Sequence, residues 1–113
     1  MVNVIVLFGR PIDQEAFDRY FTDTHLPLIR ALPDLEALVT NQVAGAAQGD
    51  AAYHLIVELR FASEEAMQEG LNSAAGQAMA QDLSRFASGG VSVLFARATT
   101  ENMGESLGAA ANA

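Results

Sequence analysis

The sequence predicts an α+β fold of the ferredoxin-like type, in which the order βαββαβ forms a four-stranded antiparallel sheet with helices on one face. The chain has 113 residues, which suffices for one hydrophobic core and not for two. Half of the residues are hydrophobic, which excludes a disordered chain. Four stretches with strand patterns and two with helical periodicity follow one another in the order of the split βαβ motif.

The first strand and the first helix are predicted over the N-terminal third of the chain. Residues 2–8 form a β-branched run that Gly9 and Pro11 end, as is typical of a central strand. Asp13 is placed to cap a helix, and Pro27 is expected to end or kink it, because the proline ring removes an N–H donor. One helical stripe is expected to face the core: Phe17, Tyr20, Phe21, Thr24, His25 and Leu28.

Two further strands are predicted in the middle of the chain. Residues 35–44 alternate between polar and apolar side chains, which indicates an edge strand, and residues 45–51 form a hairpin loop. Residues 53–61 alternate strictly. One face of this strand carries Tyr53, Leu55, Val57, Leu59 and Phe61, and the other carries His54, Ile56, Glu58 and Arg60. The pattern leaves open which of the two faces meets the helices.

The last third of the chain predicts an interrupted helix, a strand and a tail. Ser63 is a good N-cap, and Asn72 with Ser73 is expected to break the helix into two pieces. A final strand is predicted over residues 91–97. We therefore expect one domain over residues 1–98 and a flexible tail over residues 99–113, which contains no aromatic side chain.

Composition restricts the classes of partner. The formal net charge is −8, and the six cationic side chains are single, scattered arginines. Nucleic acid and anionic membrane surfaces are therefore not expected as partners. The apolar N-terminus is too short to span a membrane and lacks the features of a signal peptide, so a cytoplasmic protein is predicted. Abundant alanine without lysine suggests a bacterial genome rich in GC.

A sheet with helices on one face leaves its other face uncovered. Apolar side chains of the third strand must lie on that face, whichever of the two alternating sets turns outward. Facing two such sheets against each other would cover them, and a homodimer is the prediction.

Only His25 and His54 titrate naturally near neutral pH, and they are the candidate catalytic residues. His25 lies on the apolar helical stripe and is predicted to point toward the sheet. A buried packing role, with a hydrogen bond to a backbone carbonyl, explains it equally well. His54 with Glu58 and Arg60 could equally form a polar network between subunits. Phe17, Tyr20 and Phe21 are core residues first and candidate ligand-binding residues second.

Other kinds of site are not predicted. The chain has no cysteine and no third histidine, so neither a thiolate nucleophile nor a metal site is expected. The glycines at positions 9, 45, 89 and 90 are turn residues and form no phosphate-binding loop. No cofactor is predicted.

The segment from Phe17 to Leu28, FDRYFTDTHLPL, resembles the F-x-x-Y…H-x-P-L signature of the EthD family, which is named for ethyl tert-butyl ether degradation. The resemblance extends over about the first 98 residues and includes Leu32–Leu35, Tyr53–His54 and residues 86–90. It implies a dimeric α+β barrel in a catabolic, ether-degradation context. By position, His25 and His54 look like the two pocket histidines of a related methylmuconolactone methylisomerase, which has a tyrosine where this chain has Phe21 and a pocket cysteine that this chain lacks.

The resemblance implies a small hydrophobic, aromatic or lactone-like ligand held between sheet and helices. If the protein is an enzyme, His25 is expected to donate or accept a proton, with assistance from His54, in a cofactor-free isomerisation. Tyr20 is expected to orient a ligand oxygen. Two alternatives are a non-catalytic accessory protein of a degradation pathway and a cofactor-independent monooxygenase.

Overall fold

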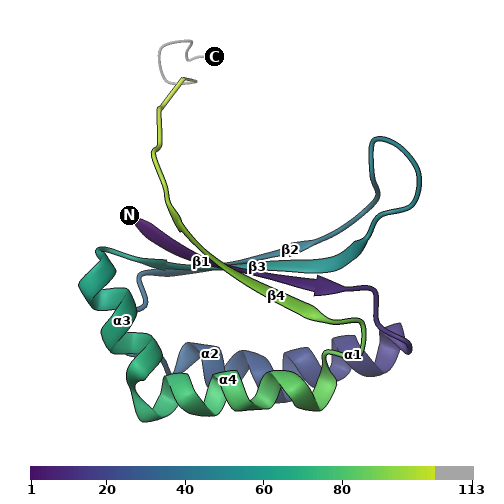
Figure 1. Cartoon of the computed structure of the whole chain (residues 1–113), viewed down its shortest axis with the longest axis horizontal. Helices are drawn as coiled ribbons and strands as arrows, with labels where there is room; N and C mark the ends of the chain where they lie inside the picture. Colours follow the sequence, from purple (N-terminus) through teal and green to yellow (C-terminus); the bar gives the residue numbers. More distant parts are fainter. Residues whose placement is uncertain (104–113) are drawn as a thin grey trace.

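A four-stranded antiparallel sheet in the order β2-β3-β1-β4 organises the computed structural model, which describes residues 1–103 (Figure 1). The strands are β1 (Val2–Gly9), β2 (Ala37–Gln42), β3 (Tyr53–Phe61) and β4 (Val91–Arg97). β1 lies in the interior of the sheet and pairs with both β3 and β4, whereas β2 and β4 are the edges. This topology confirms the predicted fold class, and the central and edge positions of β1 and β2 agree with their sequence patterns.

All the helical segments cover the same face of the sheet (Figure 1). They are α1 (Gln14–Tyr20), the π-helical turn η1 (Phe21–His25), α2 (Leu26–Arg30), α3 (Glu64–Asn72) and α4 (Ala74–Phe86). Among residues 1–103, no helix lies over the opposite face of the sheet. Within residues 1–103, no helix is both long and apolar enough to cross a membrane.

Pro27 was predicted to end or kink the first helix, and it does not end it. The helical path passes through a π-helical turn directly before the proline and continues to Arg30. Pro27 lies in the first turn of α2, where a missing N–H is tolerated. The π turn also shifts the buried stripe. Thr24, predicted to face the core, is exposed. The buried residues recur at every fourth position: Phe17, Phe21 and His25, as predicted, and Ile29, which was not predicted.

The second helical region breaks where the sequence predicts. Ser63 caps α3, since its Oγ accepts a hydrogen bond from the Ala66 N–H at 3.1 Å. Ser73 leaves the helical conformation and caps α4 through the Gly76 N–H, also at 3.1 Å. The corner between α3 and α4 is tight, because a Cβ at Gly76 would collide with the Leu71 carbonyl group. Only glycine fits there without displacing the backbone.

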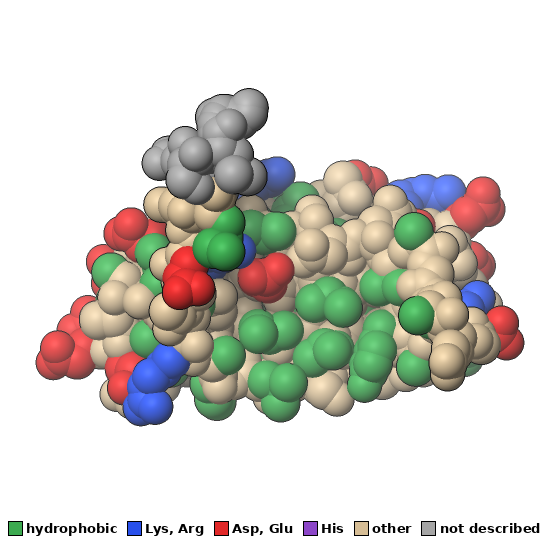
Figure 2. All heavy atoms as spheres, turned by 90° about the horizontal axis from the view of Figure 1, so that it is seen from above, with side chains coloured by type: hydrophobic (Ala, Val, Ile, Leu, Met, Phe, Trp, Pro, Cys, Tyr) green, Lys and Arg blue, Asp and Glu red, His purple; other side chains and the backbone are tan. Residues whose placement is uncertain are grey.

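The two faces of the sheet have separate roles. Val4, Val6 and Phe8 of β1 point toward the helices and are buried, together with Val57 and Leu59 of β3. The alternating residues point to the uncovered face, where Ile5 pairs with both Glu58 and Leu94. Hydrophobic side chains gather over this uncovered face in Figure 2. The set of β3 residues that turns away from the helices is therefore Ile56, Glu58 and Arg60.

His54 is the exception to the predicted alternation. Phe8 pairs with Leu55 and Gly9 pairs with Tyr53, so His54 is an extra residue without a partner on β1. Such a β-bulge lets two successive side chains point to the same side. His54 consequently contacts the Phe17 ring of α1 and does not share a face with Ile56. The prediction that His54 lies with Ile56, Glu58 and Arg60 was wrong for this reason.

The end of the domain is fixed to its beginning. The Ala98 N–H donates a hydrogen bond to the Met1 carbonyl oxygen at 2.9 Å, directly after β4. Residues 99–103 contain no helix or strand. The rest of the predicted flexible tail lies outside the described residues.

A substitution at the α3–α4 corner tests the packing described above. Gly76→Ala is expected to lower the free energy of unfolding by about 1–3 kcal/mol, because the added methyl group forces the two helices apart. Gly45→Ala is the matched control, since a Cβ there meets nothing within 4 Å. Urea unfolding measures both variants. Equal stabilities would contradict the tight corner.

Candidate functional site

A cavity of about 210 Å³ lies between the sheet and the helices. Three strands and the helical segments η1, α2, α3 and α4 contribute to its wall. The lining residues are Val4, Val6, Phe8, His25, Ile29, Val57, Leu59, Leu71, Gly76, Met79, Ala80, Leu83, Val93 and Phe95. His25 is the one side chain in this set that can form hydrogen bonds, so the cavity is an apolar space with a single imidazole on its wall.

The π-helical turn holds His25 at the cavity. His25 is the last residue of η1 and is 2% exposed. Its ring packs against the aromatic rings of Phe86 at 4.7 Å and Phe21 at 5.8 Å between centroids, and it meets Phe8 edge-on at 6.4 Å. These contacts fix the plane of the imidazole. The orientation is therefore set by packing before any ligand binds.

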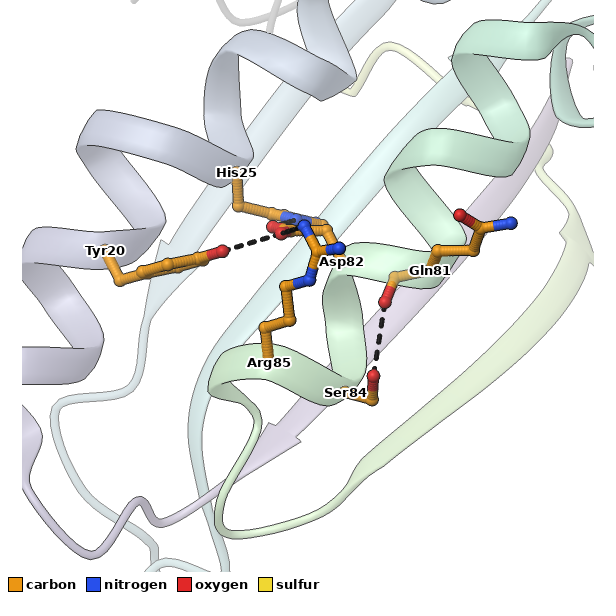
Figure 3. Close-up of polar contacts among 6 residues, drawn as sticks. All are labelled: Tyr20, His25, Gln81, Asp82, Ser84 and Arg85. Carbon is orange, nitrogen blue, oxygen red and sulfur yellow. Dashed lines mark hydrogen bonds and ion pairs between the residues drawn. The ribbon is translucent and has the colours of Figure 1, made fainter.

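His25 forms a buried pair with Asp82 of α4. The distance between His25 Nδ1 and Asp82 Oδ2 is 2.9 Å, and Asp82 is 1% exposed. The Tyr20 hydroxyl donates a hydrogen bond to the other carboxylate oxygen at 2.6 Å. Arg85, one turn further along α4, places its Nη1 3.6 Å from the same oxygen. Figure 3 shows these groups converging on the Asp82 carboxylate.

The protonation states follow from this arrangement. Burial alone would raise the pKa of the Asp82 carboxyl, but the hydrogen bonds from Tyr20 and His25 and the charge of Arg85 outweigh it, so the pKa is lowered. Asp82 is therefore an ionised acceptor. Burial lowers the pKa of the His25 imidazole, although the hydrogen bond and the charge of Asp82 oppose this shift. The hydrogen bond to Asp82 and burial raise the pKa of Tyr20, which stays a neutral donor.

One tautomer of His25 satisfies these contacts. An ionised carboxylate only accepts hydrogen bonds, so Nδ1 carries the imidazole proton and donates it to Asp82. In the neutral ring Nε2 then has a lone pair and no proton. Nε2 has no hydrogen-bond partner within residues 1–103. The site thus provides a buried base, oriented by a carboxylate, on the wall of an apolar cavity.

Asp82 was missed by the sequence analysis. It lies three residues after Met79 and four before Phe86, two buried residues of α4. A charged residue at helical spacing within an apolar stripe is the signal that could have identified it. The expected packing role of His25, a hydrogen bond to a backbone carbonyl, is replaced by this carboxylate.

His54 belongs to a different pair. Its Nε2 lies 2.7 Å from Asp18 Oδ1, and its ring meets Phe17 edge-on at 5.2 Å. His54 does not line the cavity. A row of aromatic rings connects it to His25, since Phe17 contacts Phe21 and Phe21 contacts His25. The structure therefore does not bring the two imidazoles together at one cavity.

The three candidate ligand-binding residues lie around His25 and outside the cavity wall. Phe17 and Tyr20 border a separate surface depression with Arg85, and Phe21 borders another with Asp18. Tyr20 points its hydroxyl at Asp82 (Figure 3). Within residues 1–103, no group of three or more histidines, cysteines or acidic residues could hold a metal ion.

Acid is expected to destabilise the fold through the pair of His25 and Asp82. Because the pKa of His25 is lowered in the folded state, the unfolded chain takes up this proton at higher pH than the folded chain. The free energy of unfolding should therefore fall as the pH decreases below the ordinary histidine value of about 6.5. The lowered pKa of Asp82 adds a second loss of stability at more acidic pH. Urea unfolding as a function of pH measures both.

Two variants test whether His25 is the source of this pH dependence of stability. His25→Gln should remove the loss that begins near the ordinary histidine pKa, whereas His54→Gln should retain it. An unchanged pH dependence in His25→Gln would contradict the assignment.

Comparisons with known proteins identify relatives over most of the chain. The EthD domain family matches residues 9–90. An EthD family protein from Bacillus halodurans C-125 is 27% identical, with a TM-score of 0.84 over 88% of this chain and 99% of that one. An uncharacterised 11.0 kDa protein from the thcB-thcC intergenic region of Rhodococcus erythropolis is 28% identical over 84% of this chain and 92% of its own length.

A more distant structure supports the fold. A dimeric ferredoxin-like protein of unknown function from Thermobifida fusca YX shares 15% identity, with a TM-score of 0.63 over 83% of this chain and 87% of that one. The family match spans the π-helical turn, the β-bulge at His54 and the Asp82 network. Together with the fold it confirms the resemblance seen in the sequence. The chain belongs to the EthD family.

Proposed function

We propose that the protein binds a compact ring compound in the apolar cavity and that His25 exchanges a proton with it. The observation that supports this proposal is an imidazole on the wall of an otherwise apolar cavity. Burial favours its neutral form, and its Nδ1 is hydrogen-bonded to Asp82. Nε2 is then the atom that meets the ligand. This arrangement has the two features of a general base, a fixed orientation and a free lone pair.

The size of the cavity limits the ligand. An apolar cavity of about 150 Å³ accommodates benzene. The cavity here, about 210 Å³, is moderately larger. It suits a single five- or six-membered ring with one or two small substituents. This size agrees with the small hydrophobic, aromatic or lactone-like compounds that the family resemblance implies.

The reaction that fits the site is an isomerisation by proton transfer. In an enol, the O–H bond breaks as the proton moves to Nε2, and a C–H bond forms when the resulting imidazolium returns a proton to carbon. No proton is gained or lost overall, and the reaction needs no cofactor. The Asp82 carboxylate stabilises the transient imidazolium through Nδ1. A positioned histidine typically contributes roughly 10²–10⁴-fold to such a rate.

A cyclic enol of the right size tests this proposal. Cyclohexane-1,2-dione, which exists mainly as its enol, should exchange its vinyl proton for deuterium faster in the presence of the protein. His25→Ala should lower the protein-dependent rate by roughly 10²–10⁴-fold. Proton NMR in D₂O follows the loss of the vinyl signal. His54→Gln is the matched control and should retain the rate, because His54 does not line the cavity.

Binding is measured separately from exchange. Ala80→Leu adds three carbon atoms at the cavity wall and should abolish both binding and exchange, while the exposed position of Ala80 lets the fold accept the change. Exchange that survives His25→Ala undiminished would refute the catalytic role. Binding without exchange in the wild type would support the accessory, non-catalytic alternative instead.

We also propose that the protein is a homodimer that pairs through the uncovered face of its sheet. Leu94 on this face is 54% exposed and lies beside Ile5 across β1 and β4. Two polar atoms on the same face, Asn3 Oδ1 and Arg60 Nε, are buried without a hydrogen-bond partner within the described residues. They belong to directly paired residues of β1 and β3. The dimeric relative from Thermobifida fusca has the same fold.

A pair of charge substitutions tests the dimer. Leu94→Glu places a carboxylate in the middle of the proposed interface and should produce a monomer in sedimentation experiments. Ile12→Glu is the control, because Ile12 is 90% exposed in the loop before α1 and away from the uncovered face. A Leu94→Glu protein that sediments as the wild type does would exclude this interface.

A further inference from the structure

The wall of the cavity offers a bound ligand only one polar side chain. Of the residues on its wall, His25 alone carries a hydrogen-bonding group, and the others are aliphatic, aromatic or glycine. Among the side chains of the wall, only His25 can therefore form a hydrogen bond with a ligand, and Nε2 is its nitrogen that is not bonded to Asp82. A ligand gives up its hydrogen bonds to water when it enters the cavity. It can replace one of them at Nε2 only if Nε2 plays the matching role of donor or acceptor.

In the neutral imidazole, three contacts make Nε2 an acceptor. The Asp82 carboxylate receives the Nδ1 proton at 2.9 Å, which leaves Nε2 with its lone pair. Tyr20 donates to the second carboxylate oxygen at 2.6 Å and so holds the carboxylate in this orientation. Arg85 places a positive charge 3.6 Å from the same oxygen, which favours the ionised form. Reversing the tautomer would leave the buried Asp82 oxygen facing a bare Nδ1.

We propose that the cavity selects ring compounds that donate a hydrogen bond, namely phenols and enols, over compounds of equal size that only accept one, such as ketones, ethers and lactones. This proposal rests on the proposed function, since it specifies the ligand of the same cavity. A hydroxyl group donates to Nε2 and keeps its hydrogen bond on entering the site. A carbonyl or ether oxygen faces the Nε2 lone pair and loses its hydrogen bonds to water without replacement.

The proposal narrows the ligands implied by the family resemblance. A lactone carries only acceptor oxygens unless it is enolised, so the keto form of a lactone is a poor ligand here and an enol form is a good one. The enol is also the form from which Nε2 can take an O–H proton. Donor selection and proton exchange therefore depend on the same lone pair of His25.

Binding of three non-reacting probes tests the selection. Phenol, toluene and cyclohexanone have similar size, and they carry a donor, no polar group and an acceptor, respectively. We expect phenol to bind on the order of tenfold more tightly than cyclohexanone, measured by methyl chemical-shift changes at Val57 and Leu59 on the cavity wall. Equal affinities, or tighter binding of cyclohexanone, would overturn the proposal.

Asp82→Asn is expected to reverse the preference for phenol over cyclohexanone. The Tyr20 hydroxyl should hold the amide oxygen, so that the amide NH₂ faces His25 and donates to Nδ1. Nε2 then carries the proton, and cyclohexanone should gain affinity relative to phenol by on the order of tenfold. His54→Gln is the matched control, since His54 does not line the cavity and its loss should keep the preference for phenol.

A spectroscopic measurement separates this positioning role of Asp82 from a general effect on packing. Long-range ¹H–¹⁵N spectra report which imidazole nitrogen carries the proton. In the wild type Nε2 should give the signal of an unprotonated nitrogen, and in Asp82→Asn that of a protonated one. A protonated Nε2 in the neutral wild-type ring would overturn the proposal even if Asp82→Asn does not fold.

The proposed function can fail independently of this inference. Tight binding of phenol without exchange of the cyclic enol would refute catalysis and support donor selection. Exchange of the enol together with equal affinities for phenol and cyclohexanone would refute donor selection and support catalysis.

Discussion

The buried carboxylate of Asp82 is the group on which the helical layer and its chemistry depend. An isolated buried charge is strongly unfavourable, and its cost must be offset by hydrogen bonds and opposite charge. Tyr20 of α1 and His25 of η1 supply two hydrogen bonds, and Arg85 supplies a charge. These contacts join the first helical region to α4. The interactions that keep the helices together are the same ones that orient the imidazole.

The π-helical turn makes this convergence possible. Tyr20 and His25 are five residues apart, and on a regular α-helix such residues point about 140° away from each other. A π-helical turn bonds each residue to the one five positions later and so brings these two positions toward the same side. The backbone N–H of Leu26 accordingly donates to the Phe21 carbonyl oxygen, five residues earlier. Without this turn, one carboxylate could not receive both side chains.

The sequence alone was sufficient to predict the strands and the break between α3 and α4, because these features depend on local patterns. The strand β4 and the capping role of Ser63 were predicted at the observed residues. The π-helical turn was not predicted. Pro27 indicates only that the helix is disturbed nearby, and several backbone arrangements are compatible with a proline at this position.

The parts of the site that could not be predicted depend on contacts between distant segments. His54 turned toward the helices because of a bulge, and a bulge is defined by the pairing of β3 with β1. The partner of His25 is 57 residues away in the chain. The inward direction of His25, by contrast, followed from its spacing to Phe17 and Phe21, and the structure confirms that the ring is buried beside a cavity.

The cavity and the proposed dimer interface lie on opposite faces of one sheet, and β1 and β4 contribute to both. In β1, Val6 borders the cavity while Ile5 points to the uncovered face. In β4, Val93 borders the cavity while Leu94 points away from it. Because β4 is an edge strand that pairs only with β1, its position is fixed from one side alone within a single chain. A partner packed over Leu94 would restrain β4 and, with it, the cavity wall at Val93. The proposed assembly would thus be coupled to the proposed ligand binding through one strand, in which neighbouring side chains face the interface and the cavity.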